Sequence, residues 1–189
     1  MKIGLFFGSF NPLHIGHKVI ASYMLEFSDL DKILFVVSPK NPFKKKESLL
    51  EENHRLMIIR REFEDVPNIG VSDIEFKLNQ PSYTIDTLIA LEENNSADEY
   101  SIIMGSDNLI NFKKWKNYKE ILKNFSIYVY PRPNYSVDFK HHNIHIVKDV
   151  PLMQISASFI RNAIKQEKNV SFLVPEKAWS YIDEMNFYR

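Results

Sequence analysis

Short apolar runs and amphipathic stretches alternate along this chain. The runs are buried-strand patterns, and most of them stop at glycine, proline or a polar cluster. We expect strands at Ile3–Phe7, Lys32–Pro39, Ile69–Phe76, Tyr100–Met104, Phe125–Pro131 and Asn143–Val147. Between them, apolar residues recur every three or four positions, which predicts helices at His14–Phe27, Glu51–Glu64, Ser82–Asn94, Tyr118–Lys123, Ser158–Gln166 and Glu176–Asn186. This alternation predicts an α/β fold, a Rossmann-like doubly wound parallel sheet with helices on both faces.

Length and composition narrow the class of protein. The 189 residues suit one domain, 1–189, and 44% hydrophobic content is typical of a packed globular chain. Lys+Arg and Asp+Glu number 24 each, so no overall field attracts nucleic acid or an anionic membrane. The chain has no cysteine and no apolar run near the ~20 residues of a membrane helix. We therefore expect a cytoplasmic protein without nucleic-acid or membrane partners.

The stretch "GSFNPLHIGH", from Gly8 to His17, follows the first strand directly. His14 and His17 are three residues apart, so they share one face of the first helical turn. That turn carries unpaired N–H groups and the positive end of the helix dipole, which favour an anion. Helix capping and a zinc pair are alternatives, although this spacing alone is weak evidence for zinc. The glycines, which let a ligand approach the backbone, favour phosphate over both.

A second stretch, "ISASFIR" from Ile155 to Arg161, is similar in design. Ser158 and Arg161 are three residues apart at the start of a predicted helix, so a hydroxyl and a guanidinium can meet on one anion. The alternative is that Ser156 or Ser158 only caps the helix. The sequence thus predicts two helix N-termini that are equipped to bind phosphate.

These two stretches together resemble the H-x-G-H nucleotidyltransferase superfamily. Within it, the chain resembles the bacterial nicotinate mononucleotide adenylyltransferases in the order and spacing of the motifs at Pro81–Leu88, Ile103–Leu109, Phe112–Tyr118 and Tyr130–Pro133. The resemblance implies an enzyme of NAD biosynthesis that transfers AMP from ATP to nicotinate mononucleotide. The products would be nicotinate adenine dinucleotide and pyrophosphate, with no covalent intermediate on the protein.

The resemblance also implies roles for individual residues. Those that would hold the ATP phosphates and carry catalysis are His14, His17, Lys44, Ser158 and Arg161. Those that would line the nucleotide are Gly8, Ser9, Phe10, Gly105, Asp107, Ile155 and Ser156. The acceptor would contact Tyr83, Thr84, Trp115 and Arg132. Mg²⁺ would arrive with ATP. The chain departs from the family at Phe43, where a histidine usually precedes the loop lysine.

Other functions share parts of this pattern. The letters "HIGH" also occur in class I aminoacyl-tRNA synthetases, but this chain lacks their lysine-rich second signature. Another adenylyl- or cytidylyltransferase of the superfamily, such as a phosphopantetheine adenylyltransferase, and a non-catalytic nucleotide sensor stay as alternatives. The aromatic C-terminal stretch "AWSYIDEMNFYR" could pack on its own domain or in a homo-oligomer. We expect it to pack on its own domain.

Overall fold

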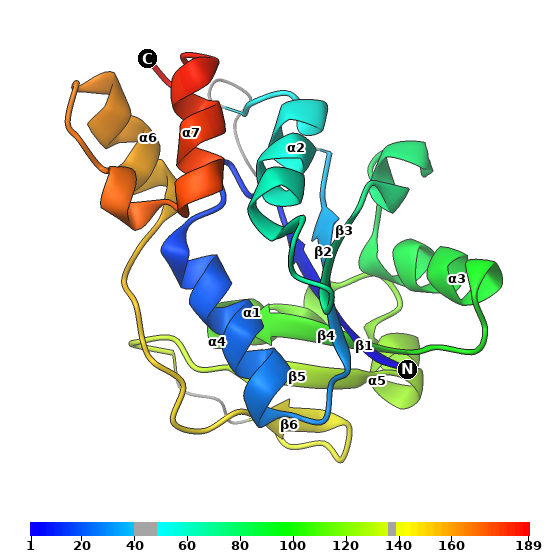
Figure 1. Cartoon of the computed structure of the whole chain (residues 1–189). Helices are drawn as coiled ribbons and strands as arrows, with labels where there is room; N and C mark the ends of the chain where they lie inside the picture. Colours follow the sequence, from blue (N-terminus) through cyan, green and yellow to red (C-terminus); the bar gives the residue numbers. More distant parts are fainter. Residues whose placement is uncertain (40–48, 136–138) are drawn as a thin grey trace.

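The sheet has six parallel strands. The protein is described by a computed structural model that covers residues 1–39, 49–135 and 139–189. Its strands lie in the order β3-β2-β1-β4-β5-β6, and each neighbouring pair is parallel (Figure 1). The strands are β1 Lys2–Gly8, β2 Lys32–Val37, β3 Ile69–Ser72, β4 Glu99–Gly105, β5 Ser126–Tyr130 and β6 Ile144–Ile146. This order confirms the predicted doubly wound α/β fold.

Helices bury both faces of the sheet, because successive strand residues point to opposite faces. In β1, Leu5 belongs to one apolar cluster and its neighbour Phe6 to the other. The cluster around Phe6 includes side chains of α1 Ile15–Phe27, α2 Glu52–Phe63, α6 Ala157–Lys165 and α7 Glu176–Glu184. The cluster around Leu5 includes side chains of α3 Thr84–Asn94, α4 Ser106–Leu109 and α5 Tyr118–Asn124.

The strand order changes direction between β1 and β4, which are hydrogen-bonded neighbours. Connections leave the two strands toward opposite faces of the sheet, so a crevice opens beyond their carboxyl ends. The turn that begins at Gly8 and the turn that begins at Gly105 both lie there. The fold therefore brings Gly8 and Gly105, which were both predicted to line the nucleotide, to the place where such sheets bind ligands.

The third strand is shorter than its apolar pattern predicts. Its pairing with β2 stops at Val36 opposite Ser72, and a 3₁₀ turn, η2 Ile74–Lys77, follows. Glu75 in this turn is buried and accepts hydrogen bonds from the hydroxyl groups of Ser82 and Thr87. The prediction of a strand through Phe76 is therefore wrong after Ser72. Short helical turns at α4, η3 Phe112–Lys114 and η4 Ser171–Leu173 were not predicted either.

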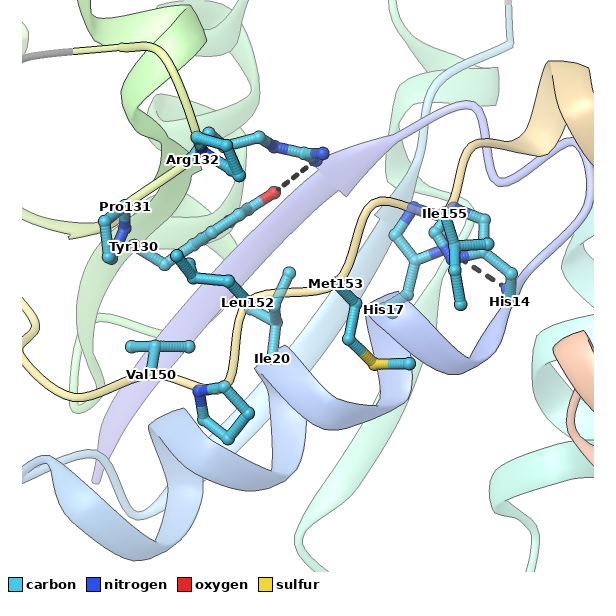
Figure 2. A pocket seen from close by; sticks show the side chains of 13 residues that line it. His14, His17, Ile20, Tyr130, Pro131, Arg132, Val150, Leu152, Met153 and Ile155 are labelled. Atoms are coloured by element: carbon cyan, nitrogen blue, oxygen red, sulfur yellow. Dashed lines mark hydrogen bonds between the residues drawn. The ribbon is translucent and has the colours of Figure 1, made fainter.

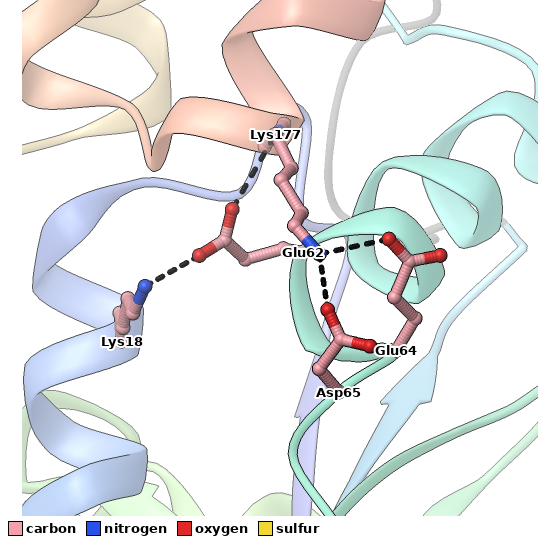
Figure 3. A network of polar contacts seen from close by, with 6 residues as sticks. Lys18, Glu62, Glu64, Asp65 and Lys177 are labelled. Carbon is pink, nitrogen blue, oxygen red and sulfur yellow. Dashed lines mark hydrogen bonds and ion pairs between the residues drawn. The ribbon is translucent and has the colours of Figure 1, made fainter.

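The C-terminal helix packs on its own domain, as expected. Tyr181 and Ile182 are buried in the same cluster as α2. Polar contacts add to this packing (Figure 3). The buried carboxylate of Glu62 on α2 accepts hydrogen bonds from Lys18 of α1 at 2.5 Å and from the Ala178 N–H of α7 at 3.4 Å. This carboxylate joins three helices at one point. Within the described ranges, no helix is both long and apolar enough to span a bilayer.

Candidate active site

The two histidines of the first turn form a stacked pair. His14 is the N-cap of α1. The centroids of the His14 and His17 rings are 3.7 Å apart, with 23° between the ring planes. The backbone N–H of His14 donates to Nδ1 of His17 at 3.2 Å (Figure 2). Because Nδ1 of His17 accepts this bond, the neutral ring carries its proton on Nε2. His17 is therefore set up as a hydrogen-bond donor through Nε2.

His14 is neutral in this site at physiological pH. The residue is 5% exposed, and no hydrogen-bond partner is found for its Nδ1 within the described part of the chain. Burial, and then the positive charge of Arg132, lower its pKa to about 4. A bound polyphosphate would act in the opposite direction and raise this pKa. A buried ring nitrogen without a hydrogen-bond partner in the described part of the chain thus lies at a helix N-terminus, beside the pocket.

Two glycines make the stacked pair possible. A Cβ on Gly16 would lie 3.1 Å from the His14 ring, and a Cβ on Gly8 would lie 2.8 Å from the ring of Phe10. Phe10 itself has a positive φ of 43° and is 2% exposed. Its ring packs edge-on against that of His17, with 5.0 Å between centroids. The side chain of Phe10 therefore supports the histidine pair, and only its backbone can face a nucleotide.

A pocket lies between the start of α1, the end of β5 and residues 150–155. Its lining includes the His14–His17 pair, Arg132 and Ile155 (Figure 2). Arg132 donates from Nη2 to the Tyr130 hydroxyl at 2.8 Å, and its Nε lies 3.4 Å from Oδ1 of Asp107. The structure thus places the predicted acceptor residue Arg132 beside the residues predicted to hold ATP. Asp107 is half-buried and joins the same cluster through this ion pair.

The second predicted phosphate site meets the first. Arg161 on α6 donates from Nη1 to the backbone carbonyl of Asn11 at 2.7 Å and from Nη2 to the Ser158 hydroxyl at 3.3 Å. Ser156 is the N-cap of α6, and its hydroxyl accepts the N–H of Phe159 at 3.2 Å. The capping interpretation is confirmed for Ser156. Because Asn11 lies in the turn between β1 and α1, both helix N-termini converge there.

Comparison with known proteins decides the family. A model of the family described as cytidylyltransferase-like matches residues 5–163. A relative from Flavobacterium psychrophilum and one from Flavobacterium johnsoniae are each 52% identical over 100% of both chains. Both are named "Probable nicotinate-nucleotide adenylyltransferase". The chain belongs to the nicotinate-nucleotide adenylyltransferase family.

Solved structures agree on the fold. The Plasmodium falciparum nicotinic acid mononucleotide adenylyltransferase complexed with NaAD superposes with a TM-score of 0.81. The alignment covers 99% of this chain and 97% of that one at 17% identity, a level that bears on the fold alone. The architecture of this adenylyltransferase family member is therefore shared with a structure that holds a dinucleotide.

Apart from Arg132, the predicted acceptor residues lie on the other side of the sheet. Tyr83 is the N-cap of α3, and Thr84 is its first residue. Lys116 lies 4.7 Å above the Tyr83 ring and 3.0 Å from a carboxylate oxygen of Asp86. Trp115, the neighbour of Lys116, packs 5.4 Å from Phe112. The two predicted acceptor motifs are therefore adjacent, although none of their residues lines the histidine pocket. Lys44 and Phe43 lie outside the described residues.

Arg55 was not anticipated from the sequence. Its side chain is fully buried on α2 and donates four hydrogen bonds to backbone carbonyls, at distances of 2.7 to 2.8 Å. The carbonyls belong to Ser9, Ser38, Pro39 and Leu50. Arg55 therefore fixes the turn after β1 to the end of β2. Its partners are backbone groups, so no residue-type pattern could have indicated it.

Tyr188 was also missed as a site-supporting residue. Its hydroxyl donates to Oδ1 of Asn11 at 2.8 Å, and the same oxygen accepts the N–H of Leu50 at 3.2 Å. Burial raises the pKa of Tyr188, so its phenol stays protonated and can donate. The C-terminal stretch thereby supports the turn between β1 and α1, which Arg161 of α6 also contacts.

We predict that acid weakens the fold through His14. The unfolded His14 binds a proton near pH 6.5 and the folded one only near pH 4, so stability falls as the pH drops through this window. The full difference is about 3 kcal/mol. His14→Asn keeps a favourable N-cap residue and cannot titrate. Urea unfolding at pH 7, 6, 5 and 4.5 should show the free energy of unfolding of the wild type falling with acid relative to that of the variant; parallel curves would refute the assignment.

Proposed function

We propose that the protein is an adenylyltransferase that transfers AMP from ATP to nicotinate mononucleotide and releases pyrophosphate. One observation carries the proposal. Arg161, from the far end of the chain, bonds the Asn11 carbonyl in the turn that leads into the His14–His17 pair. Two helix N-termini with cationic or donor side chains therefore face one region at the carboxyl ends of β1 and β4. A triphosphate is the ligand that this arrangement suits.

The chemistry needs no nucleophile from the protein. The acceptor's phosphate is already ionised at neutral pH, so one of its oxygens can attack the α-phosphorus of ATP in line. A new P–O bond forms, the bond from the α-phosphorus to the oxygen bridging the β-phosphate breaks, and pyrophosphate departs with that oxygen. His17 and Arg161 would donate to the phosphate oxygens as charge builds up on them. The protein thus works by positioning two anions and neutralising their charge.

We propose that Mg²⁺ enters with ATP. No group of three or more His, Cys, Asp or Glu side chains could hold a metal ion in residues 1–39, 49–135 and 139–189. Asp107, the acidic side chain predicted for the site, is paired with Arg132. This donor set fits a metal that phosphate oxygens and water hold. When bound, the ion would offset negative charge on the departing pyrophosphate.

We propose that the acceptor side is formed by Tyr83, Thr84 and Trp115. Thr84 opens α3, whose first N–H groups and dipole favour a carboxylate such as that of nicotinate. Trp115 offers a half-buried aromatic ring beside it. We also propose a cytoplasmic location.

The test is pyrophosphate release from ATP and Mg²⁺, with nicotinate mononucleotide and nicotinamide mononucleotide assayed in parallel. We expect turnover with a strong preference for the acid. Equal use of both would support the reaction and contradict the proposed carboxylate recognition. Turnover with neither, but with phosphopantetheine or with CTP as the donor, would assign the chain to another reaction of the superfamily. ATP binding without any turnover would indicate a nucleotide sensor.

A further inference from the structure

A buried carboxyl group lies next to the proposed acceptor site. Glu75, in η2, is 3% exposed and has no ion-pair partner within the described ranges. Its Oε1 accepts the Thr87 hydroxyl at 3.0 Å, and its Oε2 accepts the Ser82 hydroxyl at 3.1 Å. The Ser38 hydroxyl lies close enough to this carboxyl group to lower its pKa. Two hydroxyl hydrogen bonds therefore take the place of a cation.

The three hydroxyl groups around Glu75 come from separate segments of the chain. Ser38 follows β2, Ser82 lies in the loop before α3, and Thr87 lies in the first turn of α3. The backbone carbonyl of Glu75 adds a fourth bond by accepting the side-chain amide of Gln80 at 2.9 Å. Both sides of residues 83–84 are thus tied to Glu75, through Ser82 before them and Thr87 after them.

Ser38 connects this cluster to the phosphate side. Its N–H donates to the Gly8 carbonyl at 2.9 Å, and its own carbonyl accepts Nη1 of Arg55 at 2.8 Å. The same Nη1 donates to the carbonyl of Ser9 at 2.7 Å. Hydrogen bonds therefore link the turn after β1 through Arg55 to Ser38, whose hydroxyl lies near the carboxyl group of Glu75.

A charged group is a costly way to stabilise this region. Burying a charge costs free energy unless it is paired or hydrogen-bonded. Burial raises the pKa of Glu75, and the hydroxyl groups of Thr87, Ser38 and Ser82 offset only part of that shift. An ionised carboxylate has two oxygens that both accept hydrogen bonds, whereas an amide has only one. A carboxylate can therefore hold donors from different segments of the chain at once.

We propose that Glu75 is a positioning residue for the acceptor, which fixes residues 82–84 at a set place relative to the Gly8–Ser9 turn. This inference rests on the proposed function, because it assigns the loop at 82–84 to the acceptor. Glu75 does not touch substrate. It acts through Ser82 and Thr87, which set where the first turn of α3 presents its N–H groups.

The test compares Glu75→Gln with Glu62→Gln, a matched loss of a buried carboxylate on α2. The amide keeps the shape of Glu75 but cannot accept at both ends, so one hydrogen bond to a charged group is lost. The KM for nicotinate mononucleotide should rise about tenfold or more, with the KM for ATP within about twofold. Glu62→Gln should lower the thermal midpoint and leave both KM values within about twofold.

Several outcomes would overturn the proposal. An equal rise in both KM values, or a fall in kcat alone, would do so. The same result from both variants would mean that the role of Glu75 is only structural. Should Glu75→Gln fail to fold, Ser82→Ala removes one donor and should raise the same KM by a smaller factor. An unchanged KM in Ser82→Ala would contradict the proposal.

Hydrogen exchange without substrate separates this inference from the proposed function. Glu75→Gln should speed amide exchange in residues 78–88 and leave the α2–α7 contact protected. Faster exchange spread over the whole chain would overturn the positioning role. A wild-type enzyme that is inactive with nicotinate mononucleotide would refute the proposed function. The exchange result would still support or overturn the role of Glu75 in placing residues 82–84.

Discussion

Replacing His17 with alanine is expected to lower kcat about 10²–10³-fold, the loss of ~2.7–4 kcal/mol that removal of one well-placed anion donor commonly causes. The geometry gives the reason. Nδ1 of His17 accepts the backbone N–H of His14, so the remaining ring nitrogen carries the proton that can be donated to phosphate. Steady-state kinetics with saturating ATP and nicotinate mononucleotide measures the loss, and circular dichroism checks that the fold is intact.

His17→Asn is the matched control. The asparagine side-chain oxygen can accept the His14 N–H as Nδ1 does, but the side chain is too short to place a donor where Nε2 lies. If His17 acts on phosphate through Nε2, the asparagine variant should lose nearly as much activity as the alanine variant. Recovery of most of the activity in His17→Asn would mean that the ring matters only for the start of α1.

The fold could be predicted from the sequence because burial on both faces leaves a clear pattern. In β1 the apolar run includes both Leu5 and Phe6, and each belongs to a different apolar cluster. Amphipathic helices such as α2 and α7 are equally evident. The pattern failed at Ile74–Lys77, where the buried residue is Glu75 and hydrogen bonds decide the conformation. A run of apolar residues cannot show which groups will donate hydrogen bonds to a carboxyl group within it.

In the candidate site too, some residues could be predicted from local spacing and others could not. The spacing of His14 and His17 follows from helical periodicity, so their shared face was predictable, and the stacked rings agree with it. The place of Arg132 depends on how the end of β5 meets the start of α1, a contact between distant segments. Arg55 and Tyr188 act on backbone and side-chain atoms of the turn, and no local spacing indicates such partners.

One principle connects these supporting residues. The backbone carbonyl of Asn11 accepts a hydrogen bond from Arg161, and its side-chain oxygen accepts one from Tyr188. The carbonyl of Ser9 accepts a hydrogen bond from Arg55. The turn after β1 is therefore held from three directions by donors from other parts of the chain. A site that works by electrostatics needs its donors fixed before the ligand arrives, because reorganisation would use up the gain. The buried polar groups around this turn supply that rigidity.

Arg161→Ala is expected to lower kcat about 10²–10³-fold as well, because it removes a bidentate cation from the region where the two helix N-termini meet. The KM for ATP should rise with it. Arg161→Lys keeps the charge but loses the planar fork, so it should recover only part of the activity. Initial rates over a range of ATP concentrations separate kcat from KM for each variant.

Arg161 also bonds the Asn11 carbonyl, so the loss could come from a displaced turn and not from a missing cation. Tyr188→Phe distinguishes the two, since it removes another bond to Asn11 and no charge. If the guanidinium neutralises phosphate, Tyr188→Phe should cost only a few-fold, the worth of about 1 kcal/mol for one neutral hydrogen bond. A loss in Tyr188→Phe as large as that in Arg161→Ala would instead assign the effect to the position of the turn.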